Sequence, residues 1–359
     1  MLIQPNTSYI FSALLRADKT PLSQKPALFG IRFFDKNMNK ITDQSDPNYS
    51  EYSELNYSNN IGMYFNLKNT CLADIQLLKK INPEPGDCIR VLDISMEKNM
   101  DALHDALTAG AKVMYVDHHK AGEIPKHANL FAHIDLDANM CTSLIVSNLL
   151  DQKFHLWAIT AAYGDNLFAK ADAEADELKL TELQKSQLKA FGTYINYNGY
   201  GSELSDLHFE PEALYELLLQ YNSPIDAIND EGSVYYTLER AYKADMQKAA
   251  NATVMHDCDT AKVILLDDEP WARRVSGVLG NDLANQAPTK AHAVITSNTK
   301  GSFTVSVRAP LNNKQGAVEV CSNFVTGGGR AAAAGINELP KSQLTEFIGG
   351  LVSYYENNV

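Results

Sequence analysis

Three short stretches that carry aspartate or histidine each follow an apolar run, and their residue types could bind a divalent metal ion. All three are predicted strand ends: Asp93 ends one strand, Asp117-His118-His119 follows a second, and Asp165 follows the apolar run at 157–164. In an open α/β sheet, ligands lie beyond the carboxyl ends of the strands. Two carboxylates and an imidazole from adjacent strands make a site suited to Mn²⁺ or Mg²⁺, which polarises a phosphoryl oxygen. A single strand-end aspartate is more often a helix cap or a loop anchor, whereas the Asp-His-His triplet is rarer.

A glycine-rich stretch near the end of the sequence could bind an anion. Gly327, Gly328 and Gly329 are followed by Arg330 and an alanine run. Glycines let backbone N–H groups approach an anion, the alanine run can begin a helix whose N-terminus favours negative charge, and arginine can clamp a phosphate. Arg308, at the end of a predicted strand, is a second phosphate-binding candidate. The alternative is a tight glycine turn with no ligand.

These stretches have to be positioned by secondary structure, and the apolar patterns predict an α/β protein with a doubly wound parallel sheet and a second, smaller α/β domain. Strands are predicted at residues 89–94, 112–116, 261–266, 291–296 and 303–307, and helices near 71–80, 100–109, 141–150, 170–192, 211–253, 277–285 and from 341 onward. Residues 1–67 carry strand and hairpin signals instead. The helix over 232–253 is predicted to connect two lobes.

Composition excludes several classes of protein. The chain has 31 Lys and Arg against 44 Asp and Glu, a net charge of −13, and no basic run of the kind that duplex DNA binding requires. No apolar stretch approaches the roughly 20 residues of a membrane-spanning helix, and the N-terminus lacks a signal-peptide pattern, so we expect a cytoplasmic protein. The five cysteines form no C-x-x-C pair, which argues against a zinc knuckle or a disulfide framework. Arg273 and Arg274, which precede a predicted helix, add basic charge to the second lobe.

Together the Asp93, Asp117-His118-His119, Asp165 and Gly327 to Gly335 stretches resemble the DHH phosphoesterase superfamily with its DHH-associated C-terminal domain. The resemblance covers about residues 69–359 and is strongest to a bacterial subgroup of DHH-family phosphoesterases. It implies hydrolysis of a phosphoester in a small nucleotide or a short single-stranded oligonucleotide, with one or two Mn²⁺ or Mg²⁺ ions in a cleft between two domains. It leaves a homodimer open. The implied domains are a divergent β-rich segment at 1–67, a DHH metal-binding domain at 68–205, a helical linker at 206–255 and a substrate-binding domain at 256–359.

The resemblance also implies a role for each residue of the metal site. Asp93 and Asp165 are the expected carboxylate ligands, and His118 is the expected imidazole ligand. Asp117 would support the imidazoles, and His119 would lie near the phosphate that is cleaved.

On the substrate side, the resemblance assigns the phosphate to Gly327, Gly328, Gly329 and Arg330, with Arg308 as a further contact. The wider family often has histidine where this chain has Arg330, so only the position and the anion-binding role carry over.

The family's first metal motif, H-x-D-x-D-G or N-G-D-A-D-G, is missing. The chain has nine histidines and the first is His104, and a forced match at residues 4–9 puts Asn6 and Ser8 where the family has carboxylates. Neutral oxygens bind a dication more weakly than carboxylates do. The main alternative to a phosphoesterase is therefore a catalytically weak nucleotide- or phosphate-binding protein that has lost one metal site. Residues 1–67 also resemble, weakly, a small carbohydrate-binding β-module, so sugar binding is a third hypothesis.

Overall fold

The computed structural model describes residues 77–298 and 301–357, together with the backbone of short strands in the N-terminal segment. Those strands are β1 (Ala13–Asp18), β2 (Gly30–Ile31), β3 (Phe33–Phe34), β4 (Lys40–Ile41) and β5 (Asn60–Phe65). The β-rich segment at 1–67 stays a prediction. The forced motif match at residues 4–9 and most of the predicted helix at 71–80 lie outside the described residues.

The chain forms two compact units, and each of them is built from three separate segments of the sequence. The first comprises residues 1–66, 74–192 and 211–234, and the second comprises residues 67–73, 193–210 and 235–359. The domain boundaries predicted from the sequence, at 67/68, 205/206 and 255/256, stay predictions. In the part of the chain that the structure describes, no helix is both long and apolar enough to cross a membrane.

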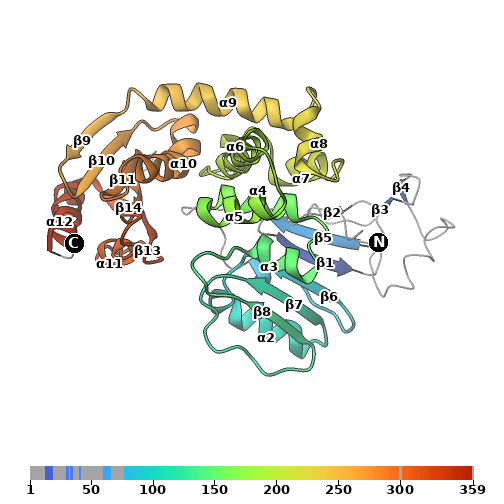
Figure 1. Ribbon diagram of the computed structural model, residues 1–359. Coiled ribbons are helices and arrows are strands. Elements are labelled where there is room, and N and C mark those ends of the chain that lie inside the picture. The colour runs from blue at the N-terminus through green and yellow to red at the C-terminus, as the bar shows by residue number, and fades with distance from the viewer. Residues whose placement is uncertain are drawn as a thin grey trace. The chain divides into compact units, whose positions relative to one another are not determined.

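The first unit is built on a sheet with the strand order β2-β5-β1-β6-β7-β8. The strands β6 (Cys88–Leu92), β7 (Lys112–Asp117) and β8 (Leu130–Ile134) are parallel (Figure 1). β1 runs antiparallel to β6, and β5 pairs antiparallel with the other edge of β1. Alternate residues of these strands enter two apolar clusters, because successive side chains of a strand point to opposite faces. One cluster includes residues of α2 (Met100–Thr108) and the other includes residues of α3 (Thr142–Leu149). Both faces are covered, which confirms the predicted α/β class.

Helices complete the first unit. They are α4 (His155–Gly164), α5 (Phe168–Glu177), α6 (Glu182–Asn198), which continues into the second unit, α7 (Pro211–Leu218) and α8 (Pro224–Asn229). In α4 nearly every residue is buried, and a Cβ atom on Gly192 of α6 would lie 2.0 Å from the carbonyl oxygen of Thr160. The absent side chain at Gly192 therefore permits a close approach of α6 to α4.

The second unit has a sheet of its own with the strand order β13-β14-β12-β11-β10-β9. Only β10 and β11 are parallel, so the second sheet is mostly antiparallel. Its strands are β9 (Thr253–Asp257), β10 (Ala261–Leu266), β11 (Ala291–Ser297), β12 (Ser302–Arg308), β13 (Gly327–Gly329) and β14 (Ala333–Pro340), and its helices are α9 (Val234–Ala249), α10 (Pro270–Gln286), α11 (Ala317–Cys321) and α12 (Leu344–Asn357). One face of the sheet packs against α10 and the other against α11 and α12.

A buried polar network joins α6, α9 and α10 within the second unit. Asp245 accepts hydrogen bonds from Nη2 of Arg274 at 2.6 Å and from the hydroxyl of Tyr197. Burial raises the pKa of Asp245, but the hydrogen bonds from Tyr197 and Arg274 outweigh it, and the pKa lies below its ordinary value. The network therefore holds a charged carboxylate inside the unit.

Replacing Asp245 by Ala is expected to lower the free energy of unfolding by about 3 kcal/mol, because it leaves the Arg274 guanidinium buried without its counter-charge. Since folding depresses the pKa, the contribution of Asp245 is fully present above the pKa of the unfolded side chain and disappears as the pH falls through the folded value. Thermal unfolding at neutral and acidic pH measures both effects. Glu239→Ala, which breaks a pair with the exposed Lys243, is the control and should change stability by less than about 1 kcal/mol. Equal losses in both variants would contradict the assignment.

Candidate functional site

The predicted Asp-His-His triplet and Asp93 lie at the same edge of the first sheet. Asp93 directly follows β6, and His118 and His119 directly follow β7, which is the parallel neighbour of β6. The backbone N–H of Asp93 donates to the carbonyl of Val116 at 3.0 Å, which fixes the two strand ends together. Asp93 has a φ of 59°, a left-handed conformation that aspartate adopts more readily than most residues.

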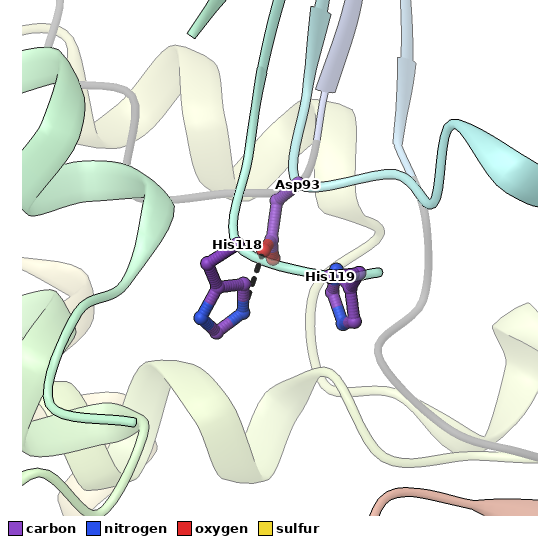
Figure 2. A group of neighbouring side chains, drawn as sticks. All are labelled: Asp93, His118 and His119. Atoms are coloured by element: carbon purple, nitrogen blue, oxygen red, sulfur yellow. Dashed lines mark ion pairs between the residues drawn. The ribbon is translucent and has the colours of Figure 1, made fainter. Parts of the chain in front are cut away.

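Figure 2 shows Asp93, His118 and His119 gathered into one cluster. Each of them offers one ligand atom, and these atoms all lie within 4.8 Å of one another. Nε2 of His118 is 3.3 Å from Oδ1 of Asp93, and the two imidazole rings lie 4.6 Å apart and nearly perpendicular, at 75°. One carboxylate and two imidazoles form a donor set that suits a divalent transition ion.

The surroundings orient the His118 ring. Its Nδ1 atom lies 2.8 Å from the backbone carbonyl of Met140, which can only accept a hydrogen bond, so Nδ1 carries the hydrogen. The lone pair of a neutral His118 ring is then on Nε2, the atom that faces Asp93. A nitrogen lone pair and a carboxylate that face each other repel unless a proton or a cation lies between them. This arrangement is typical of metal-binding histidines.

A different partner orients His119. Its Nδ1 atom lies 2.7 Å from Oδ1 of Asp117, whose side chain is fully buried. This carboxylate fixes the hydrogen on Nδ1 and leaves Nε2 as the ligand atom. On the other side of the cluster, the hydroxyl of Thr142 donates to Oδ1 of Asp93 at 2.9 Å. Each member of the cluster is thus held by a neighbour that does not itself join the cluster.

Two of these neighbours were missed by the sequence-based interpretation. The Met140 carbonyl belongs to the backbone and has no sequence signal. Thr142 lies at the start of α3 within an Asn-Met-Cys-Thr-Ser stretch, and a hydroxyl at that position was the available signal. Asp117 was predicted to support both imidazoles, whereas in the described part of the chain it orients His119, and the Met140 carbonyl orients His118.

Asp165 occupies a different kind of position from the one predicted. The apolar run before it is the helix α4 and not a strand, so Asp165 stands at a helix end, where its backbone N–H donates to Ala161 at 2.9 Å. The prediction of a strand end was wrong because α4 is buried on nearly all sides and shows no polar face. Within the described residues, the metal-ligand cluster does not include Asp165. Its role as a ligand stays a prediction.

The glycine-rich stretch is a β-hairpin. Gly327 to Gly329 form β13, and the alanines that were expected to begin a helix lead into β14. Arg330 and Ala333 exchange backbone hydrogen bonds of 2.8 and 3.2 Å and close the turn. The expectation of a helix N-terminus at this anion site was therefore wrong, because pairing with the neighbouring strand outweighs the helix propensity of alanine.

The hairpin places small residues and arginine on one face of the second sheet. Residues that lie opposite each other on neighbouring strands share a face. Arg308 of β12 lies opposite Ala333, and Ala333 pairs in turn with Arg330. Next to them, Gly335 lies opposite Gly328. A Cβ atom added to Gly328 would have no other atom within 4 Å. This face offers open space beside the arginines.

Arg308 is charged but has no acidic partner in the part of the chain that the structure describes. Its guanidinium donates to Oδ1 of Asn281 at 2.6 Å, to the hydroxyl of Ser306 at 2.8 Å, and to the carbonyls of Val307 and Gly277 at 3.2 and 3.3 Å. Burial lowers the pKa of Arg308, and the positive charge of Arg330 lowers it further. Arg308 and Arg330 thus bring two positive charges close together, and the hydrogen-bond partners of Arg308 are all neutral. A bound anion would stabilise this arrangement.

Arg273 and Arg274 are engaged differently. They lie within α10 rather than before it, and Arg273 binds both carboxylate oxygens of Asp206, at 2.9 and 2.8 Å. Arg274 binds Asp245 at 2.6 Å. The basic charge that the sequence places on the second lobe is therefore partly neutralised by carboxylates, and Arg308 and Arg330 are the stronger candidates for phosphate.

Comparison with known proteins gave structural similarities alone. No family model and no curated protein sequence matches the chain. A RecJ structure with Mn²⁺ from Thermus thermophilus is 16% identical with a TM-score of 0.45, and the match covers 75% of this chain and 45% of that protein. A second manganese-bound RecJ exonuclease is 16% identical with a TM-score of 0.40, covering 75% of each chain. The pGpG-specific phosphodiesterase PggH from Vibrio is 10% identical with a TM-score of 0.39, covering 69% of this chain and 84% of that protein.

This chain thus spans less than half of the Thermus protein. At these identities and TM-scores the comparisons assign neither an activity nor a substrate, and the chemistry has to be argued from the residues themselves.

Proposed function

We propose that the protein is a divalent-metal-dependent phosphoesterase that hydrolyses a small nucleotide or a short single-stranded oligonucleotide. The observation that carries this proposal is the Asp93–His118–His119 cluster, in which each imidazole already presents one nitrogen as a ligand. An orientation of this kind is costly to maintain without a ligand, because it turns a lone pair toward a carboxylate.

Asp93, His118 and His119 would hold one ion, and Mn²⁺ suits two imidazoles and one carboxylate better than Mg²⁺ does. A bound ion of this kind polarises a phosphoryl oxygen and supplies a nucleophile from water near neutral pH. The protein's part is to fix the ligand atoms, through the Met140 carbonyl for His118 and the Asp117 carboxylate for His119. Thr142 holds the carboxylate of Asp93.

In the second unit, Arg308 and the hairpin would bind the phosphate of the substrate. Arg308 and Arg330 supply the positive charge, and Gly328 leaves open space for an anion to approach the backbone. Gly327 and Gly329 would shape the hairpin around it, because other backbone atoms lie where their Cβ atoms would be. The neutral partners of Arg308 orient its guanidinium without cancelling its charge. Charge-assisted hydrogen bonds of this kind are stronger than those between neutral groups.

A second candidate function is a nucleotide- or phosphate-binding protein with weak or no catalysis. The specific observation in its favour is that the cluster offers three ligand residues within the described part of the chain, a number that suits one ion rather than two. Two-ion catalysis needs further carboxylates.

A hydrolysis assay with Mn²⁺ separates the two candidates. We expect metal-dependent cleavage of at least one substrate among p-nitrophenyl thymidine monophosphate, adenosine 3′,5′-bisphosphate, short single-stranded RNA and cyclic di-AMP, and none that survives chelation by EDTA. Pyrophosphate serves as a substrate without a nucleoside. If no cleavage is detected while phosphate still binds, the binding function replaces the enzymatic one.

Calorimetric titration with Mn²⁺ identifies the remaining ligands. Replacing His119 by Gln removes one imidazole donor and is expected to weaken Mn²⁺ binding by at least about tenfold. The same titration tests Asp165, since Asp165→Asn lowers the affinity if its carboxylate binds the ion and leaves the isotherm unchanged if it does not. An isotherm for His119→Gln that matches the wild type would remove His119 from the ligand set.

A further inference from the structure

Arg308 is held by a cradle of residues from α10 and from the segment that follows α6. Tyr200 is 7% exposed, and its ring lies directly on Gly277 of α10, where a Cβ atom would be 2.1 Å from Cζ of Tyr200. The Gly277 carbonyl accepts from Nη2 of Arg308, and Asn281, one helical turn further along, accepts from Nε. The glycine therefore does two things, since it gives the tyrosine ring a place to lie and gives the guanidinium an acceptor.

The Tyr200 hydroxyl lies beside the same residue of α10, 2.6 Å from where a Cβ atom on Gly277 would be, and the Gly277 carbonyl binds the guanidinium. Burial lowers the pKa of Arg308, and the nearby Tyr200 hydroxyl opposes that effect. The segment that carries Tyr200 is anchored nearby, because Asp206 accepts from the backbone of Ser202 at 2.7 Å and binds Arg273. Tyr200 thus reaches Arg308 from a fixed piece of backbone.

The chemistry of the cradle distinguishes Arg308 from Arg273 and Arg274, the two arginines of α10. Arg273 and Arg274 are oriented by carboxylates, which neutralise them. The hydrogen-bond partners of Arg308 are an amide, a hydroxyl and two carbonyls, all of them neutral, and the Tyr200 hydroxyl lies beside Gly277, one of these partners. A neutral cradle fixes the direction of the guanidinium and leaves its charge for a ligand.

We propose that Tyr200 is a positioning residue for phosphate binding, which acts by holding the Arg308 guanidinium in place before the ligand arrives. This inference rests on the proposed phosphate-binding role of Arg308. An arginine side chain that is free to rotate loses up to about 2 kcal/mol of conformational entropy when it is immobilised, so prior fixation lowers the cost of binding. Tyr200 does not need to touch the phosphate to have this effect.

Binding of inorganic phosphate to the full-length chain in EDTA, followed by calorimetry, tests the proposal without any contribution from a metal ion. Tyr200→Phe keeps the ring on Gly277 but removes the hydroxyl, and is expected to weaken phosphate binding about three- to tenfold. Gly277→Ala displaces the ring and is expected to cost about tenfold or more. Gly280→Ala is the matched control on the same helix, because its Cβ atom would make an ordinary 3.5 Å contact with Arg308, and its affinity should stay within about twofold of the wild type.

A second set of titrations separates positioning from a general effect on the fold. In an Arg308→Lys background the charge remains but the guanidinium is gone, so adding Tyr200→Phe is expected to cause no further loss. An equal loss in both backgrounds, or wild-type affinity in Tyr200→Phe, would overturn the positioning role. If the wild-type chain binds no phosphate, the proposed phosphate site and the role of Tyr200 both fail. If the wild type binds phosphate and only Arg308→Lys weakens it, the phosphate site stands and the role of Tyr200 fails.

Discussion

Replacing Asp93 by Asn is expected to weaken Mn²⁺ binding more than about 100-fold, the upper end of what the loss of a supporting neighbour costs at a metal site. Asp93 is the only carboxylate in the described three-residue cluster, and a neutral amide oxygen is a much poorer ligand for a dication. Metal-dependent hydrolysis should fall by about three orders of magnitude, since an ion contributes several kcal/mol to the transition state. Calorimetry and the hydrolysis assay measure the two effects on the same sample.

Asparagine is the right replacement because the φ of Asp93 is 59°, and asparagine tolerates this left-handed conformation where alanine would be strained. The chain offers a matched control in Asp151, an exposed aspartate with a φ of 51°. Asp151→Asn makes the same chemical change on the same kind of backbone and should leave metal binding and activity at the wild-type level. Undiminished Mn²⁺ affinity in Asp93→Asn would contradict the metal-site assignment.

Replacing Arg308 by Gln is expected to weaken phosphate binding about 30-fold or more, because it removes a half-buried charge that pairs with the anion. The hydrogen-bond partners of Arg308 are neutral. Removing its charge therefore leaves no carboxylate unbalanced among the described residues. Mn²⁺ binding should be unchanged, since the metal cluster belongs to the first unit and Arg308 to the second. Titrations with phosphate in EDTA and with Mn²⁺ in the absence of phosphate measure the two sites separately.

Arg240→Gln is the control for this change. Arg240 is an exposed residue of α9 in the same unit, and its recorded hydrogen bond goes to the hydroxyl of Thr237. The substitution changes the net charge of the chain by the same amount as Arg308→Gln. Equal losses of phosphate affinity in both variants would show that net charge, and not the Arg308 site, governs binding.

The sequence alone predicts that Asp93 and the Asp117-His118-His119 triplet come together at one edge of the first sheet. The apolar run before Asp117 predicts β7, and the polar triplet that ends it could only lie at the carboxyl end of that strand. The same reasoning, applied to β6, predicts the position of Asp93. Parallel pairing of neighbouring strands then brings both groups to one edge of the sheet, as the structure shows.

The position of Asp165 could not be inferred in this way. A fully buried helix and a buried strand both read as a continuous apolar run, and the difference lies in what surrounds them. Here the small residues of α4 and the absent side chain of Gly192 let α6 approach closely, which no property of residues 155–164 reveals. The hairpin at Gly327 to Gly329 is a similar case, because its strand partner and not its composition determines its conformation.

Contacts made by the backbone, or by residues distant in the sequence, were also beyond inference from the sequence. The Met140 carbonyl orients His118 from 22 positions away. Asn281 and Tyr200 reach Arg308 only because α10 packs on the face of the sheet that carries it. Such contacts depend on packing, and packing follows from the whole fold.

The central claim is that Asp93, His118 and His119 hold a divalent metal ion. Anomalous scattering from crystals soaked in Mn²⁺ tests it most directly, because it locates each ion and identifies the atoms around it. We predict an anomalous peak with Asp93, His118 and His119 as direct ligands, and its absence in crystals of Asp93→Asn. Soaked wild-type crystals that show no manganese at these side chains would contradict the claim, whether or not manganese is bound elsewhere.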